Sequence, residues 1–141
     1  ARAVVYGLKK EKAKVWIFNR TKKKAEQLAK EFNLDEFYGL HESNKFSMAD
    51  ILVNTTSVGM KPYEHESPIP QDYINPSQYV FDIVYTPHQT ALLKSAIKQG
   101  AKPIYGYKMV LYGGTRIFEL ITGKKAPIEI MEKALLTAYR E

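Results

Sequence analysis

Short apolar segments alternate with longer amphipathic segments along almost the whole chain, and this alternation limits the fold more than any other feature. Apolar segments such as 51–54 and 79–85 have the length of buried strands, whereas the longer segments repeat their apolar residues at helical spacing. Strands that alternate with helices favour a parallel sheet with helices on both faces. The sequence therefore predicts an α/β fold, a doubly wound parallel sheet with flanking helices.

The same pattern gives approximate bounds for each element. Thr21 is a suitable N-cap for the second helix, and Asn33 can end that helix in a left-handed conformation. We expect strands at 14–18, 36–39, 51–54, 79–85 and 102–106, and helices at 1–10, 22–32, 88–99, 107–121 and 128–139.

Length and composition limit the class of protein. A chain of 141 residues with 45% hydrophobic content can bury one core, and it has no run of about 18 apolar residues that could span a bilayer. Cysteine is absent, which excludes disulfides, a thiolate nucleophile and cysteine-ligated zinc. We expect one domain over residues 1–141, located in the cytoplasm. The net charge of +6 comes from scattered lysines, which favour a solvated surface over a nucleic-acid groove.

Polar residues follow the predicted strands directly, where open parallel sheets bind ligands. At the end of the first strand, Asn19 and Arg20 stand where NAD-binding folds commonly place an acidic residue for the ribose hydroxyls. A guanidinium can hold a phosphate with two hydrogen bonds, Thr21 adds a hydroxyl, and Lys24 lies one helical turn further on. This junction predicts a site for the 2′-phosphate of NADP. The alternative interpretation is an ordinary capped helix with a solvated lysine face.

Two further segments have the composition of ligand loops. The segment "NTTSVGM", residues 54–60, is rich in hydroxyls, and its Gly59 would let backbone run close to a ligand; it could equally be a plain polar loop. The segment "DIVYTPHQTALL" carries Tyr85, either a ligand contact or a core tyrosine. His41, His65 and His88 lack metal-ligand spacing, and no serine lies in a nucleophile elbow. We therefore predict no metal site and no catalytic residues in this chain.

Together these segments resemble the cofactor-binding, C-terminal portion of shikimate dehydrogenases. The segment "NRTKKKA" is similar to the family's Asn-Arg-Thr-x-x-Arg/Lys-Ala motif, and "NTTSVGM" to its Asn-x-Thr-Ser-x-Gly-Met loop. The segment "DIVYTPHQTALL" is similar to Asp-x-x-Tyr-x-Pro-x-x-Thr-x-Leu, and "GYKMVLYGGTRIFELITG" to the family's closing helix. The order and spacing of the four motifs make the resemblance specific.

The resemblance implies a Rossmann-like fold and NADP-dependent, reversible reduction of 3-dehydroshikimate to shikimate, a step toward the aromatic amino acids. By position, Asn19, Arg20, Thr21 and Lys24 would bind the adenosine phosphate, and Tyr85 would contact the substrate. The rest of the cofactor would be lined by Thr55, Thr56, Ser57, Ile83, Gly106 and Met109.

The sequence departs from the family at two places. The glycine-rich phosphate loop matches only at its end, Ala1–Ala3, so we expect the first strand and loop of the fold, and the amino-terminal substrate domain with the catalytic residues, to be missing. We expect the helix within 124–141 to pack toward that domain, and the chain alone to be inactive. Gly113 stands where the family usually has a substrate-binding glutamine.

Several alternatives remain open at this point. Gly113 allows a quinate/shikimate dehydrogenase paralogue that acts on another polyol acid. A different reductase with the same cofactor module, such as a glutamyl-tRNA reductase, shares the Asn-Arg-Thr junction. A noncatalytic module could instead use its lysines to bind a polyanion. The resemblance implies no membrane partner and allows a homodimer.

Overall fold

The computed structural model describes residues 1–138, which fall into two compact units, 1–47 and from residue 48 onward. The helices are α1 (Arg2–Lys10), α2 (Lys22–Glu31), α3 (Ala91–Lys98), α4 (Tyr107–Thr122) and α5 (Ile128–Ala138), and the strands are β1 (Ile17–Asn19), β2 (Phe37–Gly39), β3 (Ile51–Asn54), β4 (Tyr79–Asp82) and β5 (Lys102–Ile104). The chain also has two 3₁₀ segments, η1 (Leu40–Met48) and η2 (Gln71–Tyr73).

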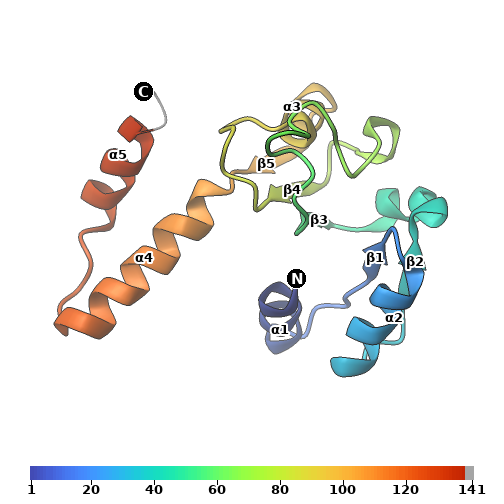
Figure 1. Ribbon diagram of the computed structural model, residues 1–141, viewed down its shortest axis with the longest axis horizontal. Coiled ribbons are helices and arrows are strands. Elements are labelled where there is room, and N and C mark those ends of the chain that lie inside the picture. The colour runs from blue at the N-terminus through green and yellow to red at the C-terminus, as the bar shows by residue number, and fades with distance from the viewer. Residues whose placement is uncertain (139–141) are drawn as a thin grey trace. The chain divides into compact units, whose positions relative to one another are not determined.

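In the first unit, β1 and β2 form a parallel pair in which Asn19 lies opposite Gly39. Helix α2 packs against both strands (Figure 1). It does so through Ala25 and Ala29, whose small side chains are 0% and 1% exposed and allow a close approach. The two strands therefore end side by side, beside the first turn of α2.

In the second unit, β3, β4 and β5 form a parallel sheet in that order. Helix α3 packs against β4 and β5 with Leu92, Leu93 and Ala96, each 0% exposed (Figure 1). These side chains recur at helical spacing, so one face of α3 is apolar and the other meets solvent. The core of this unit lies between α3 and the sheet.

Helices α4 and α5 pack side by side and run in opposite directions (Figure 1). Gly123 ends α4 in a left-handed conformation, with φ of 67°. Tyr107, Leu111 and Thr115 on α4 are buried, whereas α5 has no buried residue among its described positions. The pair therefore leaves much apolar surface in contact with solvent.

The predicted α/β architecture, parallel strands with flanking helices, is confirmed, and most bounds agree within a few residues. Four strands are shorter than predicted: β1 begins at Ile17 and β2 at Phe37, whereas β4 ends at Asp82 and β5 at Ile104. Helix α3 begins only at Ala91, because Thr90 is its N-cap. The segment η1 was not predicted, and the predicted last residue of the final helix, Tyr139, lies outside the described residues.

The strands form two separate sheets in the described residues, which have five strands between them. Within these residues, β1 pairs only with β2, and β3 pairs only with β4. The predicted buried strand at 51–54 is present and is buried at Leu52 and Asn54, 4% and 3% exposed, but Ile51 at its start is 47% exposed.

Candidate functional site

The first group of predicted site residues lies at the carboxyl end of β1. The Asn19 side chain folds back, and its Oδ1 accepts a hydrogen bond of 2.9 Å from the Thr21 amide. Thr21 is the N-cap residue of α2, but its hydroxyl makes no capping bond within the described residues. Arg20 and Lys24 are exposed, and neither has an ion-pair partner in residues 1–138. The junction thus presents two uncompensated cations and a hydroxyl.

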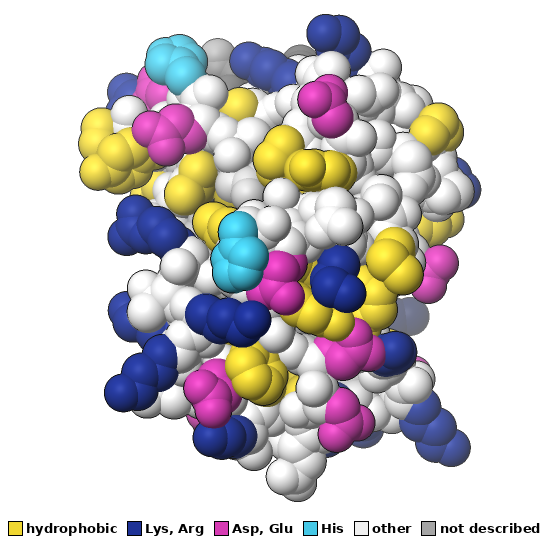
Figure 2. Space-filling view, turned by 90° about the vertical axis from the view of Figure 1, so that its right-hand side faces the viewer, with side chains coloured by type: hydrophobic (Ala, Val, Ile, Leu, Met, Phe, Trp, Pro, Cys, Tyr) yellow, Lys and Arg dark blue, Asp and Glu magenta, His cyan; other side chains and the backbone are white. Residues whose placement is uncertain are grey.

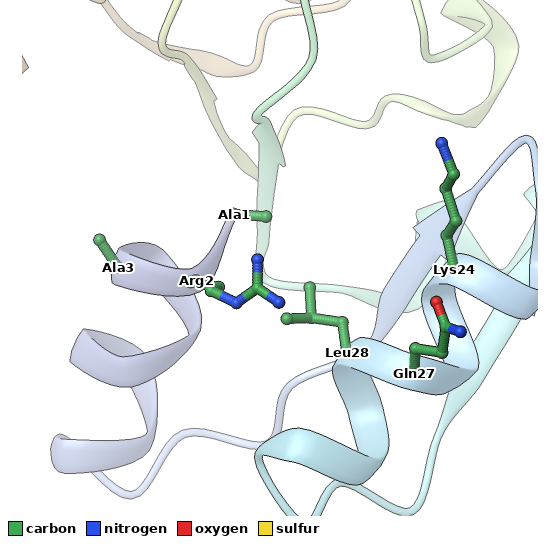
Figure 3. Close-up of a pocket in the computed structure, with 6 residues that line it drawn as sticks. All are labelled: Ala1, Arg2, Ala3, Lys24, Gln27 and Leu28. Carbon is green, nitrogen blue, oxygen red and sulfur yellow. The ribbon is translucent and has the colours of Figure 1, made fainter.

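A cavity of about 600 Å³ lies between the amino end of α1 and one face of α2. Figure 3 shows Arg2 reaching from α1 toward α2, while the Lys24 amine extends away from it. Arg2 is held there by Glu31, with Nε to Oε1 and Nη2 to Oε2 distances of 2.8 Å. The cavity is lined by Ala1, Arg2, Ala3, Lys24, Gln27 and Leu28.

A carboxylate lies beside this junction that the sequence analysis missed. Glu42 Oε2 accepts hydrogen bonds of 2.9 Å from the Gly39 amide and 3.0 Å from Lys22 Nζ. The Gly39 amide, and after it Lys22, lowers the pKa of Glu42, so this side chain is ionised at neutral pH. The only sequence signal was an acid three residues after the glycine that ends β2.

The second group begins with the loop after β3, which is organised by Asn54. Asn54 is 3% exposed, and its Oδ1 accepts hydrogen bonds from the Thr56 amide at 2.9 Å and the Thr56 hydroxyl at 2.8 Å. Its Nδ2 donates to the Val58 carbonyl at 3.0 Å. These bonds fix the loop in one conformation, with Thr55 half-buried and Thr56 and Ser57 exposed. The segment is therefore an ordered loop, with exposed hydroxyls at its tip.

Asp82, at the end of β4, joins that loop to the next one. It is 0% exposed, and its oxygens accept hydrogen bonds from Asn54 Nδ2 at 2.9 Å, the Val84 amide at 3.1 Å and the Thr90 hydroxyl at 2.6 Å. Burial raises the pKa of Asp82, although the three donors act in the opposite direction. The sequence analysis gave Asp82 no role.

Tyr85 and Ile83 follow Asp82 directly. Tyr85 is 46% exposed, which rules out the interpretation of Tyr85 as a core tyrosine. Ile83 is half-buried, and its amide donates to the Asn54 carbonyl at 3.2 Å. Thus the segment after β4 is tied to the end of β3 and leaves the Tyr85 ring accessible to a ligand.

The third part of this group is Gly106 and Met109, after β5. Gly106 packs so closely on β4 that a Cβ would lie 2.5 Å from the Val84 carbonyl oxygen and 2.7 Å from that of Asp82. Met109, in the first turn of α4, is 45% exposed. His88 stacks on Tyr105, with ring centroids 4.8 Å apart, and connects the loops after β4 and β5. The structure therefore brings the predicted residues of this unit together at the carboxyl ends of β3, β4 and β5.

In residues 1–138, no three His, Asp or Glu side chains are grouped as metal ligands would be, and no helix is long and apolar enough to cross a membrane. On the face drawn in Figure 2, basic and acidic side chains are interspersed.

No family model matches this chain, but individual curated proteins are clearly similar to it in sequence. The chain is 40% identical to the NADP-dependent shikimate dehydrogenase of Methanobrevibacter smithii over 96% of this chain and 51% of that protein. It is 44% identical to the corresponding enzyme of Haloarcula marismortui over 95% and 50% of the two chains. The chain therefore spans about half the length of the curated relatives it matches.

Solved structures of related enzymes are also similar to this chain. Shikimate 5-dehydrogenase of Thermus thermophilus, solved with NADP(H) and shikimate, matches with a TM-score of 0.88 and 33% identity over 96% of this chain and 50% of that one. Quinate dehydrogenase of Corynebacterium glutamicum, solved with NAD, matches with a TM-score of 0.85 and 25% identity over 96% and 51%. Sequence and structure together show that this chain is similar, over nearly its whole length, to the Rossmann-like C-terminal portion of NADP-dependent shikimate dehydrogenases.

Proposed function

We propose that this chain is the NADP-binding half of a shikimate dehydrogenase, which interconverts 3-dehydroshikimate and shikimate in aromatic amino acid biosynthesis. The observation that carries the proposal is the junction after β1, where Arg20 and Lys24 are exposed and without ion-pair partners in the described residues. An adenosine 2′-phosphate supplies the charge that these two cations lack. The similarity to NADP-dependent enzymes supports the same cofactor.

Each group of residues has a distinct role in this proposal. Asn19 holds the junction in shape, Thr21 offers its hydroxyl and the amino end of α2, and Arg20 and Lys24 neutralise the phosphate. The remainder of the cofactor lies against Thr55, Thr56, Ser57, Ile83, Gly106 and Met109, and Tyr85 contacts the substrate. When bound, the nicotinamide supplies the hydride chemistry, and these residues position and desolvate it.

The acid–base residues belong, in this proposal, to an amino-terminal substrate domain. The chain covers only half of its relatives, which is consistent with such a domain. The apolar surface of α4 and α5 suits a covering partner, since Ile121 is 79% exposed and Ile130 is 70% exposed. We further propose that the enzyme acts in the cytoplasm.

The first test is nucleotide binding by the intact protein that carries this chain. Calorimetric titration with NADP and then NAD should show a preference for NADP of about tenfold or more, because a charge-assisted bidentate contact is lost with NAD. Arg20→Ala should abolish most of this preference and leave NAD affinity nearly unchanged. Lys23→Ala removes a neighbouring exposed cation of α2 and is the matched control. Equal affinity for the two nucleotides in the parent protein would refute the cofactor assignment.

Substrate choice needs a separate assay because Gly113 lacks a side chain that could bind a hydroxyl. No atom lies within 4 Å of the position that a Cβ would take at Gly113, so this part of α4 is open. Rates of NADPH formation with shikimate and with quinate distinguish the proposed enzyme from a paralogue for another polyol acid. Binding of RNA that weakens steeply with salt, with no response to the 2′-phosphate of NADP, would favour the polyanion module instead.

A further inference from the structure

The ion pair formed by Glu42 and Lys22 lies directly beside the proposed 2′-phosphate site. Asn19 and Gly39 are opposite each other in the parallel pair of β1 and β2, whose neighbouring strands lie about 4.8 Å apart. Glu42 Oε2 is 2.9 Å from the Gly39 amide, so the carboxylate lies at the same edge as Asn19. Lys22 is the first residue of α2, directly after Thr21.

The carboxylate is held firmly in this place. It accepts the Gly39 amide, the Lys22 ammonium lies 3.0 Å away, and His41 Nε2 is 3.5 Å from the same oxygen. The Glu42 side chain is 25% exposed and the Lys22 side chain 49% exposed. A backbone bond fixes Glu42 more strongly than the ion pair does, because an exposed pair of this kind contributes little by itself.

The charge of Glu42 bears on which nucleotide binds. An acidic side chain near the ribose favours NAD, since it accepts bonds from the ribose hydroxyls and repels a 2′-phosphate. In this chain the acid is absent from the end of β1, but the Glu42 carboxylate is bonded to Gly39, the last residue of the adjacent strand. Lys22 forms an ion pair with Glu42 and compensates that negative charge. Because its ammonium is engaged in this pair, Lys22 does not bind the proposed phosphate.

We infer that Glu42 and Lys22 set the strength of the preference for NADP over NAD, with Glu42 opposing the 2′-phosphate and Lys22 offsetting Glu42. This inference rests on the proposed NADP site. In this inference Lys22 is paired with Glu42 and does not bind the phosphate. Arg20 and Lys24, in contrast, have no ion-pair partner among residues 1–138. The inference also explains why three successive lysines do not act alike.

The test is a double-mutant cycle on nucleotide affinity in the intact protein that carries this chain. Glu42→Gln keeps an acceptor for the Gly39 amide but removes the charge, so NADP should bind about three- to tenfold more tightly at low salt, with NAD affinity nearly unchanged. Lys22→Met should weaken NADP binding by a similar factor. The double variant should return close to the parent value, because the two opposite charges are removed together.

Glu36→Gln is the matched control. Glu36 is paired with Lys14, and its side chain is 27% exposed, but it precedes β2 and so lies at the opposite end of that strand. It changes the net charge by the same amount as Glu42→Gln and should leave the preference for NADP unaltered.

The outcomes separate the two proposals. A parent protein that binds NADP no better than NAD refutes the cofactor assignment, and the inference falls with it. If the parent prefers NADP, the inference is overturned when Glu42→Gln weakens NADP binding, when it alters NAD equally, or when Glu36→Gln has the same effect. In high salt, Glu42→Gln should no longer bind NADP more tightly than the parent, while the parent keeps part of its preference for NADP over NAD. This result would support an effect of the Glu42 charge that salt screens.

Discussion

At the scale of single residues, the N-cap glycine of α4, Gly106, and a glycine inside that helix, Gly113, differ in what their missing side chain permits. Gly106 lies against the backbone of β4, where a Cβ would be 2.5 Å from a carbonyl oxygen. Gly113 has no atom within 4 Å of its Cβ position. Glycine is thus required by packing at the first position and only lowers helix stability at the second.

We predict that Gly106→Ala and Gly113→Ala change stability in opposite directions. Gly106→Ala should lower the free energy of unfolding by at least about 2 kcal/mol, because backbone atoms must move to admit the methyl group. Gly113→Ala should raise it by about 1 kcal/mol through helix propensity. Urea unfolding of both variants measures this. A neutral Gly106→Ala would show that the close contact with β4 is not maintained in solution.

Asp82 gives a prediction that depends on pH. Its pKa is raised in the folded state by burial, so the folded protein binds this proton more tightly than the unfolded chain does. Stability contributed by protonation is therefore present at low pH and is lost as pH rises through the folded pKa. Asp82→Asn cannot titrate.

The measurement compares the free energy of unfolding of the parent and Asp82→Asn in urea between pH 7 and pH 4. As pH falls, the free energy of unfolding of the parent should rise relative to that of Asp82→Asn. The other carboxylates are present in both proteins, so their contributions to this difference cancel. A difference that stays constant, or shifts toward the variant, would contradict the raised pKa.

At the scale of elements, the start of α3 depends on one hydroxyl with two functions. Thr90 Oγ1 accepts the Leu93 amide at 3.3 Å and donates to Asp82 Oδ2 at 2.6 Å. The same side chain thus caps the helix and satisfies a buried carboxylate. Asp82 in turn holds the loops after β3 and β4, so the cap and the candidate site share one network.

We predict that Thr90→Val costs about 2–4 kcal/mol, the sum of a lost cap and an unsatisfied buried oxygen. Thr90→Ser should recover most of this loss because it restores the hydroxyl. Thr115→Val is the control, since Thr115 is also buried but its hydroxyl donates only to the Tyr112 carbonyl. Similar losses for both valine variants, measured by urea unfolding, would argue against a special role for Thr90.

At the scale of the whole molecule, the helices differ in how much they bury. Helix α3 buries Leu92, Leu93 and Ala96, whereas α5 has no buried residue among its described positions. Local opening is easiest where few apolar contacts must break. Helix α5 is thus expected to open more readily than α3.

We predict that hydrogen exchange of the 141-residue chain is fast in α5 and slow in α3. In the intact protein, protection of α5 should rise if the proposed substrate domain covers its apolar side, while α3 should change little. Mass spectrometry of both forms measures this directly. Equal protection of α5 in the two forms would contradict the proposed domain contact, and equal protection of α3 and α5 would contradict the burial argument.

The elements were largely predictable because they depend on local patterns, whereas most of the candidate cofactor contacts came from the family resemblance. Strand β3, at 51–54, and helix α2, after Thr21, follow from runs of apolar residues and a capping residue. The cations Arg20 and Lys24 follow from the residue types expected at a strand end. The exposure of Tyr85 did not follow, because the same segment is compatible with a buried ring.

Features that depend on distant residues were not predictable. The Glu42–Lys22 pair joins residues on two elements, and the Asp82 network joins Asn54, Val84 and Thr90. Ile51 was expected inside, but its strand pairs on one side only within the described residues. Each of these facts depends on which segments meet in space.

By itself the sequence determined the α/β class, the order of helices and strands, and the residue types at each strand end, because hydrophobic period and local capping act over a few residues. Only the tertiary structure decided which charges are compensated, which carboxylate is buried and which glycine is sterically required. Those properties depend on distances of about 3 Å between groups far apart in the chain, and folding brings such groups together without leaving a local pattern.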